Sequence, residues 1–175
     1  MASRVVPRGP VLSRADTIDA VERMQACAHQ AYPMVRDLTG LDGDESITVE
    51  VVDRPTWITA NTTGMAAAMD PLLQRIEGRT RDSVVRELGS RGTALEIAVV
   101  LAWLSTKVLG QVEVFGTPGR LLLVAPTIVD VERRLGVRPD EFRLWVALHE
   151  QTHRVQFGGV PWLRDHLLSL IAEFV

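Results

Sequence analysis

Apolar residues recur at helical spacing soon after the opening of the chain, from Ser13 to Gly40. Ser13 suits an N-cap and Gly40 suits a helix end, so this stretch predicts a helix that breaks or kinks near Pro33. Residues 46–53 (SITVEVVD) instead alternate apolar and polar or opposite-face positions with a period of two. That period predicts a strand with one buried face.

The middle of the chain predicts two further helices. Residues 54–64 have the composition of a turn, which leads into a helix over about residues 65–76, and residues 77–84 predict a solvated link. The next helix is expected from about Thr93 to Gly110. Because it is apolar on most of its sides, we expect it to lie at the centre of the core.

Residues 111–126 predict a hairpin, with two short extended segments around a Gly-Pro-Gly turn and a closing Pro126. The turn lacks the lysine and hydroxyl residues that follow a phosphate-binding loop. Residues 127–137 then predict a short helix that stops at Gly136. These segments add two strands and one helix to the expected fold.

Two helices are predicted after residue 138. The first begins at Pro139, a residue suited to the first helical position, with two acidic residues in its first turn, and ends at the Gly158–Gly159 pair. The second begins at Pro161 and is still apolar at the last residue. The fold class is therefore α+β and predominantly helical. We expect residues 1–175 to form a single domain of an incomplete chain, because the last predicted helix has no cap.

Composition and charge exclude several functional classes. The hydrophobic content of 46% and charged content of 23% are ordinary for a globular domain. The net charge is −3 and the arginines are scattered, which argues against a nucleic-acid or membrane partner. Cys27 is the single cysteine, so an internal disulfide and a thiolate zinc site are excluded. With no secretory signal pattern and no apolar run of membrane-spanning length, the expected location is cytoplasmic.

The strongest chemical signal is the segment HEQTH, residues 149–153. His149 and His153 are four residues apart, so on a helix both imidazoles lie on one face and can bind the same zinc ion. Glu150 stands beside the first histidine, where it can accept a proton from an attacking water as a general base. The spacing therefore predicts a Zn²⁺-dependent hydrolytic site.

A third ligand is needed, and the last predicted helix offers His166 and Glu173. The short link after residue 157 predicts an antiparallel helix pair, in which His166 lies level with the two motif histidines. His166 is therefore the predicted third ligand and Glu173 the alternative. Asp165 could accept a hydrogen bond from a ligand histidine, and a ligand beyond residue 175 is a further possibility.

Other chemically interesting side chains are expected to be structural. Trp57, Trp103 and Trp145 are predicted to lie in the core and not to stack on a cofactor. Cys27 is expected to be a small buried residue, and His29 a residue of the surface or the edge of the core.

Four stretches together resemble a known family. They are VVDRPTWITAN, LSTKVLGQVEVF, GRLLLVAPTIVDVERRLGV and FRLWVALHEQTHRVQFGGVPWLRDHL. These segments resemble the zincin-like metallopeptidase type 2 family, whose members are also labelled as deazaflavin-coenzyme-biosynthesis-associated hydrolases. The resemblance implies a predominantly helical zincin-like domain with bound zinc, motif histidines at His149 and His153, and the motif glutamate at Glu150. Members are usually longer than this chain, so the resemblance implies that residues 1–175 are the N-terminal part of a longer protein.

Two functions follow as hypotheses. The first is a zinc-dependent hydrolase that cleaves a peptide or another amide bond. The second is a zincin-shaped binding or assembly protein with a structural zinc and no catalysis. The second is favoured by the lack of a recognisable strand signature for aligning a substrate.

Overall fold

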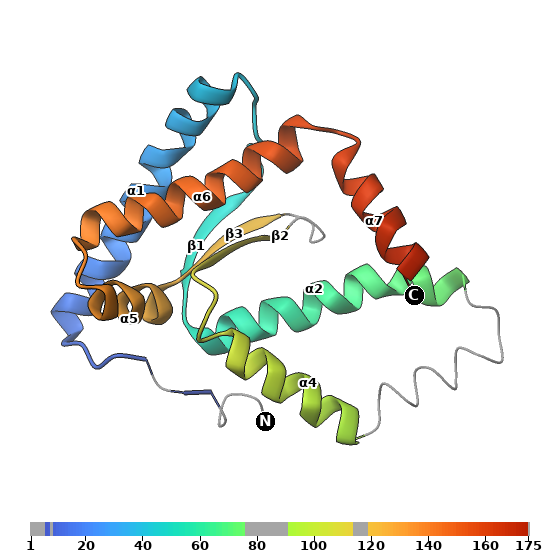
Figure 1. Cartoon of the computed structure of the whole chain (residues 1–175), viewed down its shortest axis with the longest axis horizontal. Helices are drawn as coiled ribbons and strands as arrows, with labels where there is room; N and C mark the ends of the chain where they lie inside the picture. Colours follow the sequence, from blue (N-terminus) through green and yellow to red (C-terminus); the bar gives the residue numbers. More distant parts are fainter. Residues whose placement is uncertain (1–5, 8, 76–90, 114–118, 175) are drawn as a thin grey trace.

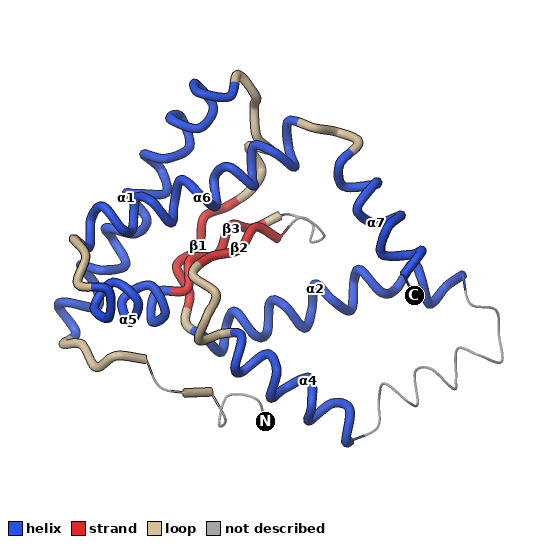
Figure 2. Tube along the Cα trace, viewed as in Figure 1, coloured by secondary structure: helices blue, strands red, loops and turns tan. Residues whose placement is uncertain are grey.

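The structure of the protein is a computed structural model that describes residues 6–7, 9–75, 91–113 and 119–174. A small sheet lies at the centre, and helices cover both of its faces (Figure 1). The expected α+β, predominantly helical class is confirmed. Figure 2 shows how short the strands are in comparison with the surrounding helices. Among the described residues, no helix has both the length and the apolar character that crossing a membrane requires.

The sheet consists of β1 (Thr48–Val52), β2 (Gly110–Glu113) and β3 (Arg120–Val124). Their order is β1-β3-β2, with β3 parallel to β1 and antiparallel to β2. The predicted strand and hairpin segments are therefore confirmed. The hairpin turn at residues 116–118 and the predicted link at residues 77–84 lie outside the described residues. β2 forms one edge of the sheet.

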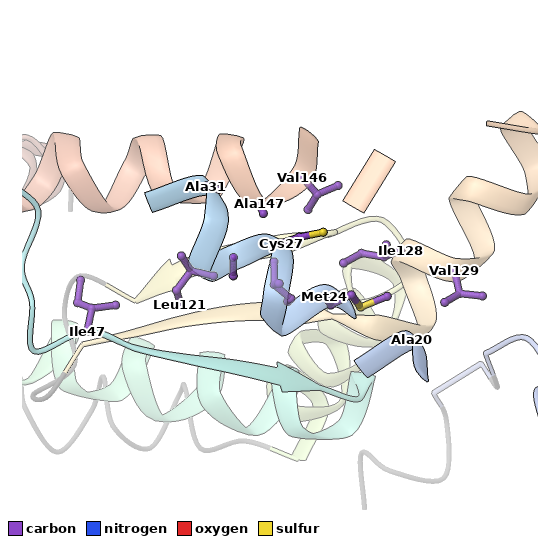
Figure 3. Close-up of a cluster of buried hydrophobic side chains, with 12 residues drawn as sticks. Ala20, Met24, Cys27, Ala31, Ile47, Leu121, Ile128, Val129, Val146 and Ala147 are labelled. Carbon is purple, nitrogen blue, oxygen red and sulfur yellow. The ribbon is translucent and has the colours of Figure 1, made fainter. Parts of the chain in front are cut away.

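Alternate residues of β3 face two separate parts of the core. Leu121 and Leu123 face a cluster built from three helices, α1 (Arg14–Thr39), α5 (Ala125–Leu135) and α6 (Pro139–Gly159). Several side chains of this cluster are labelled in Figure 3. Leu122 and Val124 face a second cluster built from α2 (Arg54–Arg75) and α4 (Arg91–Leu104). All four side chains are fully or almost fully buried. A strand buried on both faces explains why residues 121–124 are apolar without alternation.

The first helix, α1 (Arg14–Thr39), begins and ends where the sequence predicts. The Asp16 amide donates to the Ser13 hydroxyl at 3.1 Å. Gly40 ends the helix with a φ of 67°, a conformation that glycine adopts without strain. The predicted break is absent, because Pro33 lies inside one continuous helix. Packing of this helix against α6 favours its continuity over the local preference of proline.

The helix α2 (Arg54–Arg75) begins earlier than predicted, because residues 54–64 are helical and do not form a turn. Asp53 provides the missing start signal: its side chain accepts a hydrogen bond from the Thr56 amide at 2.8 Å. Pro55 follows in the first turn, where its missing N–H costs nothing. The hydroxyl groups of the threonines that suggested a turn donate to helix carbonyls.

The helix α4 (Arg91–Leu104) ends six residues before the predicted end at Gly110. It is also less central than predicted. Leu101 and Ala102 are buried against the sheet, while Val99, Val100 and Trp103 are exposed. An apolar helix packed on one side only exposes its other apolar residues, so the prediction of a central helix was wrong.

The last three helices have the predicted order. They are α5 (Ala125–Leu135), α6 (Pro139–Gly159) and α7 (Leu163–Phe174). Gly136 ends α5 with a φ of 64°. However, α7 turns away from α6 and does not run back alongside it (Figure 1). The predicted antiparallel pair is therefore wrong, because the chain leaves α6 in an extended conformation at Val160, with φ −120° and ψ 87°.

Candidate metal centre

The helix α6 carries the HEQTH segment and is held firmly between α1, α5 and the sheet. One stripe of the helix is buried and includes Val146, Ala147, Gln151 and Val155. The Gln151 amide donates to the carbonyl of Ala28 in α1 at 2.9 Å. The opposite stripe is open, because His149 is exposed and His153 is half-buried.

The two motif histidines lie side by side on this open stripe. Their ring centroids are 4.8 Å apart, and the ring planes are nearly perpendicular at 87°. The Nδ1 atom of His153 lies 3.4 Å from the side-chain oxygen of Gln156. Two adjacent imidazole groups, both reachable from solvent, provide the nitrogen donors that zinc prefers. The donor set therefore fits part of a zinc site, as the spacing predicts.

Glu150 points away from the solvent, with 4% of its surface exposed. Its side chain lies against Gly110, the first residue of β2. A Cβ atom placed on Gly110 would be 2.6 Å from the Glu150 Cγ and 2.8 Å from both its Cδ and Oε1. The carboxyl group thus occupies the space that a side chain at position 110 would fill. Burial raises the pKa of Glu150 from its ordinary value of 4.5 to about 7.

The predicted third ligand is not brought to this pair. In the described part of the chain, no three histidine, cysteine, aspartate or glutamate side chains gather as a set that could hold a metal ion. His166 lies at the start of α7 with its ring 5.8 Å from that of Trp162. His166 and Glu173 therefore stay predictions from the sequence.

Three aromatic rings follow one another along the open stripe of α6. The Phe142 and Trp145 centroids are 6.0 Å apart, with ring planes inclined by 19°. The Trp145 and His149 centroids are 6.1 Å apart, with planes inclined by 20°. Trp145 is 57% exposed and Trp103 is 60% exposed, so the prediction that both are core residues was wrong. Trp57 is buried as predicted.

The edge strand β2 is fixed in place beside this helix. Gln111, the residue after Gly110, accepts hydrogen bonds from the Trp57 indole at 2.8 Å and from the Asn61 amide at 3.1 Å. Its own amide donates to the Asn61 side chain at 3.1 Å. This network ties β2 to α2 on the face of the sheet opposite α6. A fixed strand therefore lies next to Glu150, where the sequence predicted an extended segment but offered no recognisable signature for a strand that aligns a substrate.

Comparison with known proteins identifies the family to which the chain belongs. A family model described as a zincin-like metallopeptidase matches residues 1–175. The chain belongs to the zincin-like metallopeptidase family. The resemblance found in the sequence is therefore confirmed, while the association with a deazaflavin coenzyme stays a prediction. A comparison with curated proteins found no match.

One solved structure similar to this zincin-like chain comes from Chloroflexus aurantiacus and is described as "a putative hydrolase with a novel fold". It is 28% identical, and the match has a TM-score of 0.74. The match covers 97% of this chain but 54% of that one. The chain thus spans about half the length of this relative. Family and relative both point to hydrolytic chemistry.

Sequence reasoning missed two residues of this site. Gly110 had been placed at the end of a helix, and its significance comes from Glu150, 40 positions further on. Gln151 lies within the motif, between Glu150 and His153, and no local pattern indicates its contact with Ala28. Both residues act through long-range contacts, which spacing alone does not reveal.

Proposed function

We propose that the protein is a zinc-dependent hydrolase that cleaves a peptide or another amide bond. His149 and His153 would hold the metal, with the third ligand predicted as His166 or, alternatively, Glu173. One observation carries the proposal: Glu150 is buried against the edge strand while the two histidines beside it are open to solvent. Burying a carboxyl group that has no catalytic role costs free energy. A general base, in contrast, benefits from the raised pKa that burial gives.

Each residue has a definite task in this proposal. Zinc, when bound, supplies a Lewis acid that polarises a carbonyl group and lowers the pKa of water. Glu150 accepts a proton from the attacking water and passes it to the nitrogen of the leaving amine. A pKa near neutrality suits a group that must both take and release a proton at physiological pH. Burial between α6 and β2 limits the positions that the carboxyl group can adopt.

The edge strand supports a peptide as the substrate. β2 pairs with β3 on one side only, within the sheet that the structure describes. An extended peptide can add to such an edge through main-chain hydrogen bonds. Because Gly110 touches the Glu150 carboxyl, a peptide aligned with β2 would have its backbone close to the general base.

Metal content and turnover test the proposal together. The purified chain is expected to bind about one zinc per molecule, as measured by mass spectrometry, and His149→Ala is expected to lose it. A pool of internally quenched peptides then tests hydrolysis, with Glu150→Gln as the matched variant. Glu150→Gln should keep the zinc but lose at least about a hundredfold in rate.

Two results would contradict the proposal. Turnover by Glu150→Gln equal to that of the wild type would remove Glu150 from its role. Zinc binding without turnover of any peptide in the pool would indicate a structural zinc and the non-catalytic alternative.

A further inference from the structure

The open stripe of α6 carries more than the two histidines. Phe142, Trp145 and His149 form a continuous line of stacked rings, called the aromatic row below. Phe142 is half-buried and packs against the core, whereas Trp145 is exposed over more than half of its surface. In the aromatic row, Phe142 is thus held against the core, Trp145 is exposed, and His149 is the predicted metal ligand.

Trp145 is exposed, although the residues directly before and after it in the sequence are not. Leu144 is half-buried and Val146 is buried, so the helix has the usual apolar stripe without needing a tryptophan on the open side. Single exposed apolar side chains are common on protein surfaces, so exposure alone does not mark a binding site. Trp145 is distinguished by its position, because its ring stacks beside the predicted metal ligand His149. Tryptophan is also among the residues enriched at the hot spots of protein interfaces.

The length of the row limits what can bind to it. At one end, Arg138 and Glu141 form an ion pair at the start of α6, and at the other end stand His149 and His153. Between these polar ends only Trp145 offers a broad exposed apolar surface on this stripe. A partner helix needs apolar anchors over two turns or more, whereas a single side chain or ring needs one. The row therefore fits one apolar group.

We propose that Trp145, backed by Phe142, binds an apolar or aromatic group of the substrate next to the bond that is cleaved. This inference rests on the proposed function, because it takes His149 as a zinc ligand. The Trp145 ring lies one helical turn from His149 and almost parallel to it. A substituent on a zinc-bound group can therefore reach the indole, and stacking on its face favours flat, apolar groups. The preferred substrates are peptides or amides with such a group beside the scissile bond.

Two simple hydroxamates test this inference without requiring a known substrate. Acetohydroxamate and benzohydroxamate share the same zinc-chelating group and differ in a methyl group against a phenyl ring. Their affinities for the zinc-loaded chain are measured by calorimetry. Benzohydroxamate is expected to gain about tenfold over acetohydroxamate through contact with the indole. This gain should largely disappear in Trp145→Ala.

The control variant is Trp103→Ala, because Trp103 is similarly exposed but lies on α4. It should keep the full preference for benzohydroxamate. A preference that is the same in Trp145→Ala and the wild type would overturn the aromatic subsite while leaving the metal site intact. If neither hydroxamate binds the zinc-loaded wild type, the proposed function fails, and the subsite fails with it. Circular dichroism of both variants shows whether the fold is kept.

Discussion

The environment of one carboxyl group determines much of the chemistry proposed for this protein. Glu150 and Glu141 belong to the same helix, yet Glu141 is exposed and pairs with Arg138 while Glu150 is buried. The difference arises because Glu150 faces the sheet at the one position where β2 has a glycine. The residue type alone therefore does not determine the role of a glutamate in this helix. The role of Glu150 depends on the space that the missing side chain of Gly110 provides.

The raised pKa of Glu150 predicts how the stability of the metal-free chain depends on pH. The folded state holds the proton up to a pKa of about 7, whereas the unfolded state releases it near 4.5. The free energy of unfolding contributed by this group should therefore fall between pH 4.5 and 7 and then level off, by about 3 kcal/mol in total. Urea titrations of the wild type and Glu150→Gln, both with chelator, measure the difference. A difference that does not change over this range would contradict the prediction.

Gly110 should tolerate no side chain. In Gly110→Ala the new methyl group would collide with the Glu150 side chain, so the buried carboxyl group, the strand or the helix would have to shift. We expect the free energy of unfolding to fall by about 1–3 kcal/mol, as measured by denaturant titration.

The matched substitution is Gly64→Ala in α2, where no described atom lies within 4 Å of the new Cβ. It should be neutral or stabilising by up to about 1 kcal/mol, because alanine favours helices over glycine. Equal effects of the two substitutions would show that the contact with Glu150 is unimportant.

At the scale of elements, the contact between α1 and α6 sets the position of the metal-binding stripe. Gln151 is fully buried, and its amide bonds to Ala28 across this contact. Within the described residues, its side-chain oxygen is the one buried side-chain nitrogen or oxygen atom that has no hydrogen-bond partner. The helix pair therefore depends on a polar group that is half satisfied.

Substitutions of Gln151 should show whether the volume or the charge of this buried side chain has the larger effect on the free energy of unfolding. Gln151→Met keeps the volume and removes both the bond and the unpartnered oxygen, so its effect should stay within about 1 kcal/mol. Gln151→Glu places a charge opposite a carbonyl in the core and should cost about 3 kcal/mol or more at pH 7. Guanidinium denaturation at pH 7 compares them. A Met variant as unstable as the Glu variant would contradict this reasoning.

The sequence predicted the type of most elements, and the errors concern their ends and their packing. The helix starts at Ser13 and Pro139 were predictable because caps and prolines are local signals. The start of α2 was missed because Asp53, its cap, was assigned to the end of the strand, and residues 54–64 were assigned to a turn. The exposure of α4 and the direction of α7 depend on which neighbours cover them, and periodicity holds no such information.

In the site, too, local sequence signals predicted some features, whereas features that depend on distant contacts were missed. The histidine pair follows from helical spacing alone, and the structure places the two rings side by side. The recess at Gly110 and the stacking of Trp145 on His149 depend on three-dimensional contacts. Trp145 was expected to lie in the core, whereas its side chain is exposed beside the motif.

For the whole molecule, metal binding should couple to folding. A ligand that binds only the folded chain raises its stability, by about 2.7 kcal/mol at a hundredfold excess over the dissociation constant. Added Zn²⁺ should therefore raise the melting temperature of the wild type, and His149→Ala should abolish the increase. Thermal unfolding followed by circular dichroism measures both.

His29→Ala provides the control, because His29 is exposed on α1 and belongs to no predicted site. This variant should keep the zinc-dependent increase. A loss of the increase in His29→Ala, or an undiminished increase in His149→Ala, would place the metal elsewhere.

The packing of α6 on α1 also has a consequence for how the chain folds during synthesis. The bond between Gln151 and Ala28 joins residues 123 positions apart. The apolar side of α1, including Met24 and Ala31, therefore lacks part of its final packing until the ribosome has made α6. Contacts between residues so far apart in the sequence slow folding, and apolar surfaces that promote aggregation stay exposed for longer. The helix that carries the two histidines thus also completes the core cluster around α1, so the histidine pair is held in its final position only once that packing has formed.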